Sequence, residues 1–254
     1  GNGMVRFVGA ASLRVNGSIS GAASVTNVAA SGGTAVNGAP VIFGGDNKAY
    51  TGATTVTGGI LRVNTGITAT SAFNVGAGGI LQGNGGTINT SISTVINGTG
   101  TGALGTISAG TGTGNIGAFT TGNLSLGEFS RMVADVNFDG TGSSDRINVS
   151  ALTITSGAAL EVNLLGVAPQ IGTTVLVINN AGVWNNGLLS VGGSTVADDA
   201  TFTTASGTYR LDYNYTGALG SGVAVTLLEV IPEPSTMGLL GFAMVAVGIR
   251  RRRA

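Results

Sequence analysis

The fold is set by a short repeat, which reads YTGATTV at residues 50–56 and GILRVN at residues 59–64. Its second half returns as GILQGN at residues 79–84, so that Leu81 repeats the position of Leu61. The pattern Leu-x-Val-Asn also begins at Leu13 and at Leu160. A period of about 20 residues, with short apolar strands and Gly/Asn corners, is typical of a stacked solenoid. Stacking would bury a continuous column of Leu, Val and Ile that one coil cannot bury alone.

The composition supports β structure throughout the body. Glycine accounts for 46 of 254 residues, and charged residues for only 9 %, so turns are frequent and helix formers scarce. Apolar residues alternate with small polar ones, which favours half-buried strands. Unrelated hairpins in a β-sandwich are the alternative to a solenoid.

The repeat resembles the autotransporter-associated β-strand repeat, also called the passenger-associated repeat. The resemblance rests on residues 50–56 and 59–64, and residues 108–126 look like the downstream part of such arrays. It implies a right-handed parallel β-helix in a surface or secreted protein. The membrane barrel of true autotransporters has no counterpart in the sequence, so self-translocation is not implied.

Three segments are expected along the chain. Residues 1–127 are predicted to form Gly/Thr/Asn-rich solenoid repeats, with the clearest unit at 46–64 and a second at 71–84. Residues 128–230 carry longer alternating runs and are predicted to cap the open end of the solenoid, whose edge would otherwise invite aggregation. Residues 231–254 form a separate tail. In the cap, the larger aromatic residues are expected in the core, with a saccharide platform as the alternative: Trp184, Phe202, Tyr209, Tyr213 and Tyr215.

The tail combines three elements in a fixed order. Pro232, Glu233 and Pro234 form a rigid peptide that ends the preceding β structure. An apolar run follows at residues 237–249 and is expected to form one short hydrophobic helix; it spans ~20 Å as a helix, against a hydrocarbon core of ~30 Å. The long side chains of the following arginines can reach the membrane surface, which partly makes up the difference in length. The chain then closes with a cytoplasmic-side basic block, which consists of Arg250, Arg251, Arg252 and Arg253.

This tail resembles the PEP-CTERM sorting signal of Gram-negative, biofilm-forming bacteria. The resemblance covers about a tenth of the chain, through PEPST, GLLGFAMVAVGI and RRRR in that order. It implies an exosortase-type membrane protease as partner, which recognises Pro232-Glu233-Pro234 and removes the tail. A plain C-terminal anchor and a buried core helix are the alternatives. Because position 1 is Gly and no signal peptide precedes the body, the sequence is expected to be a fragment or processed form of a longer chain.

Charge and missing residue types exclude several function classes. Without the four terminal arginines, 7 basic residues face 11 acidic ones, a net charge of −4, which argues against nucleic-acid binding. The absence of cysteine removes disulfides and thiol chemistry. The absence of histidine removes the commonest general base and transition-metal ligand.

A calcium loop is the sharpest candidate for a metal site. Asp135, Asn137 and Asp139, followed by Gly140, match the first half of the D-x-[DN]-x-[DN]-G pattern. The Glu expected at position 12 is replaced by Arg146, with Asp145 one place early. The other interpretation is a strand with a polar face that ends in a Gly turn, and no cofactor.

We expect a non-enzymatic, exported β-solenoid with a structural or adhesive role. Its final place would be the outer surface or the extracellular matrix of a Gram-negative bacterium, after transient anchoring in the inner membrane, with exopolysaccharide as a candidate ligand. A carbohydrate-active β-helix enzyme would need paired acids or a base beside Arg or Lys. Neither Asp198-Asp199 nor the single lysine, Lys48, forms such a group with its sequence neighbours. Ice binding would need a Thr ladder at the coil period, and Thr55/Thr57 and Thr68/Thr70 do not recur at it.

Overall fold

Three sheets wrap a common core in the computed structural model, which describes residues 4–7, 12–22, 24–28, 40–68, 71–140, 142–166 and 168–231. The first sheet contains β1 (Met4–Phe7), β4 (Ser24–Val28), β7 (Thr54–Thr57), β10 (Phe73–Val75), β13 (Ser93–Ile96), β16 (Asn123–Leu126) and β20 (Ala151–Ile154). The second contains β2 (Leu13–Val15), β5 (Pro40–Phe43), β8 (Gly59–Val63), β11 (Gly79–Gly83), β14 (Gly105–Ala109), β17 (Ser130–Asn137), β21 (Ala159–Leu165), β23 (Ser190–Val191) and β24 (Ser194–Thr195), with β18 (Ser143–Ser144) beside β17. The third contains β3 (Ile19–Gly21), β6 (Lys48–Tyr50), β9 (Gly66–Ile67), β12 (Thr87–Ile88), β15 (Ala118–Thr120), β19 (Arg146–Val149), β22 (Thr174–Asn180), β27 (Gly220–Val230), β26 (Gly207–Gly217) and β25 (Thr201–Thr203).

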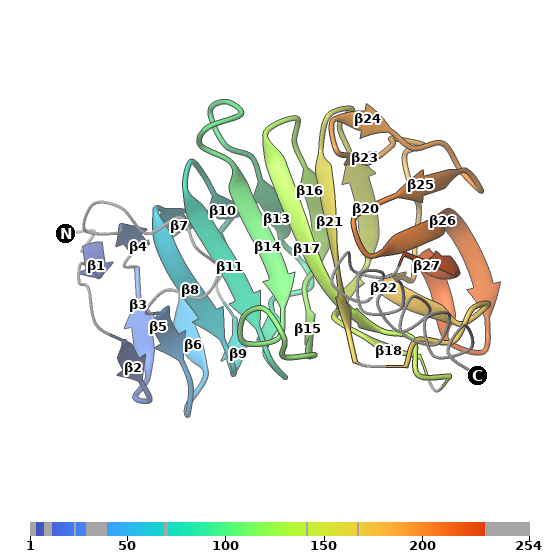
Figure 1. Ribbon diagram of the computed structural model, residues 1–254. Coiled ribbons are helices and arrows are strands. Elements are labelled where there is room, and N and C mark those ends of the chain that lie inside the picture. The colour runs from blue at the N-terminus through green and yellow to red at the C-terminus, as the bar shows by residue number, and fades with distance from the viewer. Residues whose placement is uncertain are drawn as a thin grey trace, which may run out of the picture.

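Successive strands visit the three sheets in turn, so each coil lies beside the same part of the next coil. The described residues complete seven such coils, from β1–β2–β3 to β20–β21–β22, and the strands pair in parallel from coil to coil. Figure 1 shows the coils stacked from the blue N-terminal end toward the orange cap. The predicted all-β parallel solenoid is therefore confirmed.

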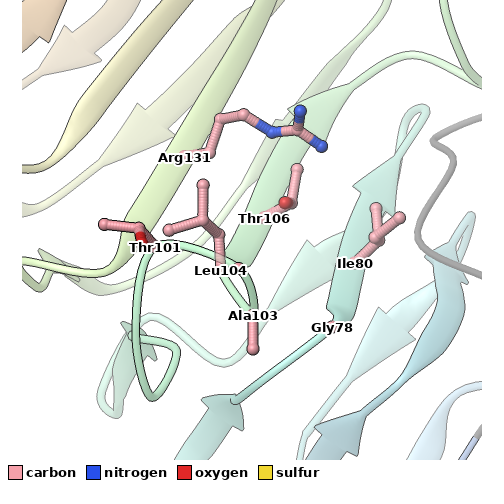
Figure 2. A pocket seen from close by; sticks show the side chains of 8 residues that line it. Gly78, Ile80, Thr101, Ala103, Leu104, Thr106 and Arg131 are labelled. Atoms are coloured by element: carbon pink, nitrogen blue, oxygen red, sulfur yellow. The ribbon is translucent and has the colours of Figure 1, made fainter. Parts of the chain in front are cut away.

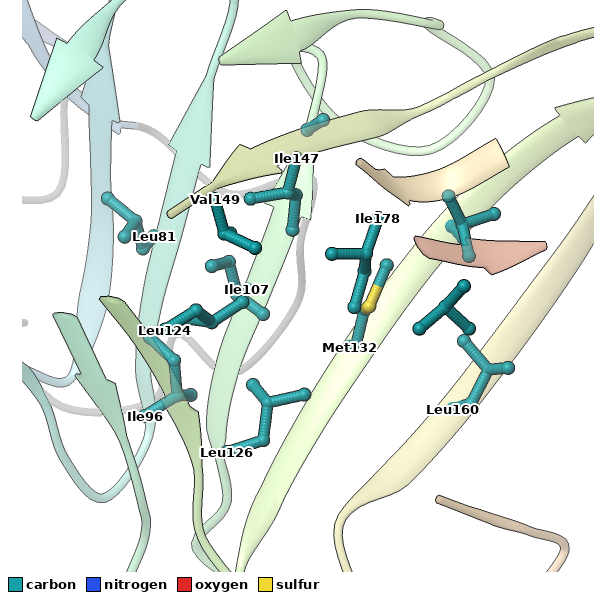
Figure 3. Close-up of a cluster of buried hydrophobic side chains, with 14 of the residues drawn as sticks. Leu81, Ile96, Ile107, Leu124, Leu126, Met132, Ile147, Val149, Leu160 and Ile178 are labelled. Carbon is teal, nitrogen blue, oxygen red and sulfur yellow. The ribbon is translucent and has the colours of Figure 1, made fainter. Parts of the chain in front are cut away.

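The recurring leucines form one column in the second sheet. Ladder pairing joins Leu61 to Leu81, the same position of the next unit, and continues from there along the interior of the solenoid. The whole column is Leu13, Val41, Leu61, Leu81, Ile107, Met132 and Leu160. It is buried from Leu61 to Leu160, whereas Val41 is partly buried and Leu13, in the first coil, is 46 % exposed. Figure 3 shows how its members meet residues of the other two sheets, such as Leu124 and Ile147, inside the coils. Burial of this column stabilises the stack, since each buried Leu or Ile contributes about 1.5–3 kcal/mol.

The coils differ in length along the chain, and the shortest lie in its middle. Leu61 pairs with Leu81 in the central coils, whereas Leu13 pairs with Val41 near the N-terminus and Arg131 with Ala159 in the later coils, both of which are longer steps in sequence. The extra residues lie mainly in loops that fold over the outside of the second sheet. Parallel pairing of β14 with β17 runs across residue 128, so the predicted boundary between repeats and cap falls inside the sixth coil. The longer strands after residue 128 predicted a cap, but β17 still pairs in parallel with β14 and β21 as a solenoid strand.

An antiparallel cap covers the C-terminal end. β22 pairs antiparallel with β27, β27 with β26, and β26 with β25, while β24 folds back on β23. Phe202, Tyr209 and Tyr213 are buried there, at 7 %, 0 % and 2 % exposure. A β-rich cap is thus present, although it begins later than the lengthening of the strands suggested.

The predicted C-terminal helix at residues 237–249 lies outside the described residues. Within the part of the chain that the structure describes, no helix is long and apolar enough to cross a membrane.

Candidate functional site

The last strand of the cap leads directly into the predicted sorting motif. β27 ends at Val230, which pairs with Gly207, and the Ile231 N–H donates a hydrogen bond to the Ser206 carbonyl at 3.2 Å. Pro232 follows at once, and Pro232, Glu233, Pro234 and Arg250–Arg253 lie outside the described residues. The folded body therefore ends one residue before the motif, with no linker between them.

The cap holds a tryptophan flat against a fixed tyrosine. The rings of Trp184 and Tyr213 stack with centroids 4.8 Å apart and planes 3° apart. The Tyr213 hydroxyl accepts a hydrogen bond from the Leu189 N–H at 2.7 Å and donates one to the Val196 carbonyl at 3.0 Å. Burial raises the pKa of this hydroxyl to about 12. The Trp184 indole N–H donates to the Gly187 carbonyl at 2.9 Å, so both rings are held in place.

A pocket of about 310 Å³ opens beside this stack. Two polar residues from different strands line it, Asn180 from the end of β22 and Tyr215 from β26. Trp184 and Tyr215 are only half-buried, whereas the sequence placed both in the cap core. The remaining lining residues are Ala181, Gly182, Tyr213, Asn214, Thr216, Ser221 and Gly222.

A β-bulge accounts for the exposure of Tyr215. Alternation along β26 turns Tyr209, Leu211 and Tyr213 inward, and would turn Tyr215 inward as well. The register of β26 against β27 shifts between Asp212 and Tyr215, which inserts one extra residue. Such a bulge re-aims the side chains that follow it, and alternation alone gives no signal for it.

The three calcium candidates lie along β17 and the turn after it, but they are engaged with protein groups. Asp135 Oδ2 accepts hydrogen bonds from the N–H groups of Gly114 and Asn115, the latter at 3.2 Å, and Oδ1 accepts one from Asn163 Nδ2 at 2.9 Å. Asn137 Nδ2 donates to Asp139 Oδ2 at 2.9 Å. Across the described ranges, no group of three or more His, Cys, Asp or Glu side chains could hold a metal ion. Asp135 instead fastens the loop of residues 110–117 over the second sheet.

Asp145 completes this fastening. It is 1 % exposed, and its Oδ1 accepts a hydrogen bond from the Gly117 N–H at 2.9 Å. Burial raises the pKa of its carboxyl group to about 7, although the hydrogen bonds from the Gly117 and Asp135 amides act to lower that pKa. From the sequence, Asp145 was noted only because it lies one place before the Glu position of a calcium loop.

Lys48 and Arg62 also have structural partners. Lys48 is fully buried, and its ammonium donates to the carbonyls of Gly44 at 2.9 Å and Asp46 at 2.5 Å. Arg62 Nη2 donates to Gln82 Oε1 at 2.8 Å and to the Thr111 carbonyl at 2.5 Å, across two coils and onto the covering loop. Burial lowers the pKa of both cationic groups.

A smaller pocket of about 200 Å³ lies on the second sheet, under residues 101–104. Figure 2 shows Arg131 extending along its wall beside Thr106 and Leu104. Its Nη1 lies 3.3 Å from Glu161 Oε2, while its Nε is buried without a hydrogen-bond partner among the described residues. The ion pair with Glu161 leaves the pocket little free positive charge.

Asp198 and Asp199 occupy a turn rather than a strand, and Asp199 has φ 57°. Asp198 accepts hydrogen bonds from the Tyr213 N–H at 2.9 Å and from Asn214 Nδ2 at 2.6 Å. Asp199 Oδ1 lies 3.9 Å from Arg210 Nε. Burial raises the pKa of nearby Asp212, and the charges of Asp199 and Asp198 raise it further. This edge of the cap is therefore acidic.

The outward column of the first sheet carries no continuous threonine ladder within the described strands. Ladder pairing gives it mixed residues: Thr26, Thr55, Asn74, Val95, Ser125 and Thr153. A regular Thr array of the kind expected for ice binding is thus missing from this face.

Comparison with known proteins assigns the tail alone. Residues 230–253 match the PEP-CTERM protein-sorting motif, and no curated protein matches the chain. The match spans the end of β27, the Pro-Glu-Pro segment, the apolar run and the arginines. A PEP-CTERM motif implies export to the cell surface and processing by an exosortase, so the chain carries a C-terminal sorting signal behind a β-rich body.

Proposed function

We propose that this protein is a non-enzymatic, structural or adhesive β-solenoid that an exosortase delivers to the cell surface or extracellular matrix of a Gram-negative bacterium. Translocation stalls at residues 237–249, with Arg250–Arg253 held inside. Pro232-Glu233-Pro234 is then presented at the outer face of the inner membrane and processed there. The body belongs to the autotransporter-associated repeat class and coils with a right hand, the hand that nearly all parallel crossover connections share.

The observation that carries the proposal is the position of the motif. The match begins at residue 230, where the last cap strand ends, so the whole described body precedes the signal. A folded, capped solenoid joined directly to a sorting signal is suited to become an intact surface module.

The sorting step is tested by cell fractionation with intact-mass measurement of the C-terminal fragment. Wild-type protein in the surface or medium fraction should lack the mass that follows the Pro-Glu-Pro region. Glu233→Ala should remain full-length in the inner membrane. Full-length wild-type protein confined to that membrane would instead make the tail a plain anchor.

A non-enzymatic body is supported by how the ionisable groups are used. Lys48, Arg62 and Asp135 each hold backbone or side-chain groups of the fold. Asp145, the group whose pKa is raised to about 7, is 1 % exposed and sealed under a loop. None of them lines the two pockets described above.

A binding assay with the exopolysaccharide of the producing cells distinguishes an adhesive role from a pure spacer role. Purified protein should sediment with that polymer in a saturable manner if the body is adhesive. Protein that stays in the supernatant would leave the spacer role.

A further inference from the structure

We propose that the cap pocket formed by Trp184, Tyr215, Asn180, Thr216 and Ser221 binds a neutral saccharide. This inference rests on the proposed surface role and adds to it a site and a ligand class. Figure 1 places the elements concerned, β22, β26 and β27, at the C-terminal end of the stacked coils.

The aromatic floor is preorganised for a sugar ring. Tyr213 fixes one face of Trp184, and Trp184 backbone pairing with Leu152 ties the indole to the last coil. The ring stays half-exposed beside the pocket. A flat, immobile aromatic surface offers large contact area without loss of side-chain freedom on binding, and the C–H face of a pyranose is apolar enough to cover it.

The walls offer uncharged hydrogen-bonding groups. Asn180 is 7 % exposed, and its Oδ1 accepts the Gly182 N–H at 3.1 Å, which leaves the Nδ2 donors for a ligand. Ser221 Oγ donates to the Asn180 carbonyl at 3.0 Å and keeps its acceptor lone pairs. Tyr215 and Thr216 of β26 also line the pocket, and each carries a hydroxyl. Saccharide hydroxyls pair with such mixed donors and acceptors.

Charge selects a neutral ligand over an acidic one. The pocket is lined by no basic side chain. The acidic edge adjoins it, because Asp198 holds the lining residue Asn214 at 2.6 Å and Asp212 accepts the Asn214 N–H at 3.0 Å. A uronate would meet these carboxylates at close range, which like-charge repulsion disfavours. The volume of about 310 Å³ is at the lower end of the ~300–1,000 Å³ typical of ligand pockets.

The test uses the fact that Trp184 is the single tryptophan of the chain, so its fluorescence reports this site alone. The full chain, kept in a zwitterionic detergent without a sugar headgroup, is titrated with neutral tetrasaccharides of glucose, galactose and mannose, and with a uronic acid tetramer. At least one neutral tetramer should change the emission saturably below about 10 mM. The uronic acid tetramer should bind more weakly than that neutral one.

Matched variants locate the binding. Tyr215→Phe combined with Thr216→Val removes two hydroxyls while keeping the ring and the β-branched side chain, and should weaken binding about tenfold. Thr201→Val, at an exposed threonine on β25, should leave the titration unchanged.

The proposal is overturned if no neutral tetramer changes the emission, if the double variant binds as tightly as wild type, or if the uronate binds better. Failure of the sugar site would leave sorting of the tail untouched in the fractionation assay. Protein retained in the inner membrane but still sugar-binding would instead overturn the proposed delivery and spare the site.

Discussion

Asp145 and Asp135 are joined by two hydrogen bonds that run in opposite directions. The Asp145 N–H donates to the Asp135 carbonyl at 2.7 Å, and the Asp135 N–H donates to Asp145 Oδ2 at 3.3 Å. The two side chains then reach in the same direction to hold Gly114, Asn115 and Gly117 of the covering loop. The pair thus ties the sixth coil to the loop of the fifth coil that covers it.

The first prediction concerns pH. The pKa of Asp145 is raised to about 7 in the fold from 3.8, so the folded state holds a proton that the unfolded state has released between those values. The contribution of Asp145 to the free energy of unfolding is fully present below about pH 4 and is lost as pH rises through 7. The loss amounts to about 1.4 kcal/mol for each unit of pKa shift. Urea denaturation across pH 4–8 should show that fall. Asp145→Asn should flatten it, while Glu161→Gln, at a carboxylate 46 % exposed, should retain it. A slope unchanged in Asp145→Asn would contradict the assignment.

The second prediction concerns the loop. Asp135→Ala leaves the N–H groups of Gly114 and Asn115 and the Asn163 amide without their acceptor. Gly114 and Asn115 are exposed, so water can replace the carboxylate, and each hydrogen bond lost costs about 0.5–1.5 kcal/mol. Hydrogen exchange at Gly114 and Asn115 should therefore accelerate. The Gly105 amide, which donates to the Phe129 carbonyl at 3.0 Å, serves as the internal reference and should keep its protection.

The third prediction concerns the leucine column. Leu81 is 0 % exposed and stacks between Leu61 and Ile107. Leu81→Ala should destabilise the fold by about 2–5 kcal/mol through lost burial and the cavity left behind. Ile171→Ala, at a site 65 % exposed, should stay within about 0.5 kcal/mol of wild type. Urea midpoints of both variants check this, and equal effects would argue against the column.

The fourth prediction concerns a corner glycine. A Cβ on Gly79 would lie 2.1 Å from the Val56 carbonyl oxygen and 2.8 Å from its carbon, both backbone atoms of the adjacent coil. Gly79→Ala should therefore force neighbouring coils apart and lower the melting temperature. Gly100→Ala, where nothing lies within 4 Å of the added atom, provides the control. Equal melting temperatures would show that the corner has room to relax.

Periodicity predicted the stack because register and sequence spacing coincide there. Leu61 and Leu81, which occupy the same position of two successive repeats, are ladder partners. Residues 87–117 show no comparable sequence period, yet β12, β13 and β14 lie in the ladders. Long insertions hide the period there, since Thr87 pairs with Thr120, a much longer step than that from Leu61 to Leu81. The entropy cost of closing a loop rises only slowly with its length. Such insertions therefore leave the fold intact, although they remove the regular sequence period that would reveal it.

The candidate sites were harder to predict than the fold. The sorting motif is contiguous and could be read directly, and the family match confirms it over residues 230–253. The cap pocket draws residues from three strands and depends on the bulge before Tyr215. Asp135 looked like a metal ligand because its loop donors, Gly114 and Asn115, lie in the preceding coil, far from it in sequence.

The direct passage from β27 into the sorting motif also determines how the protein would resist force. Residues 232–236 can span at most ~18 Å before the apolar run, so tension on a membrane-held tail reaches Val230 with almost no slack. β27 lies between β22 and β26 and is antiparallel to both. Tension along β27 would load both hydrogen-bond ladders in shear, so that many bonds must break together rather than one after another. The cap would then act as a mechanical clamp that keeps the solenoid folded while its tail is pulled.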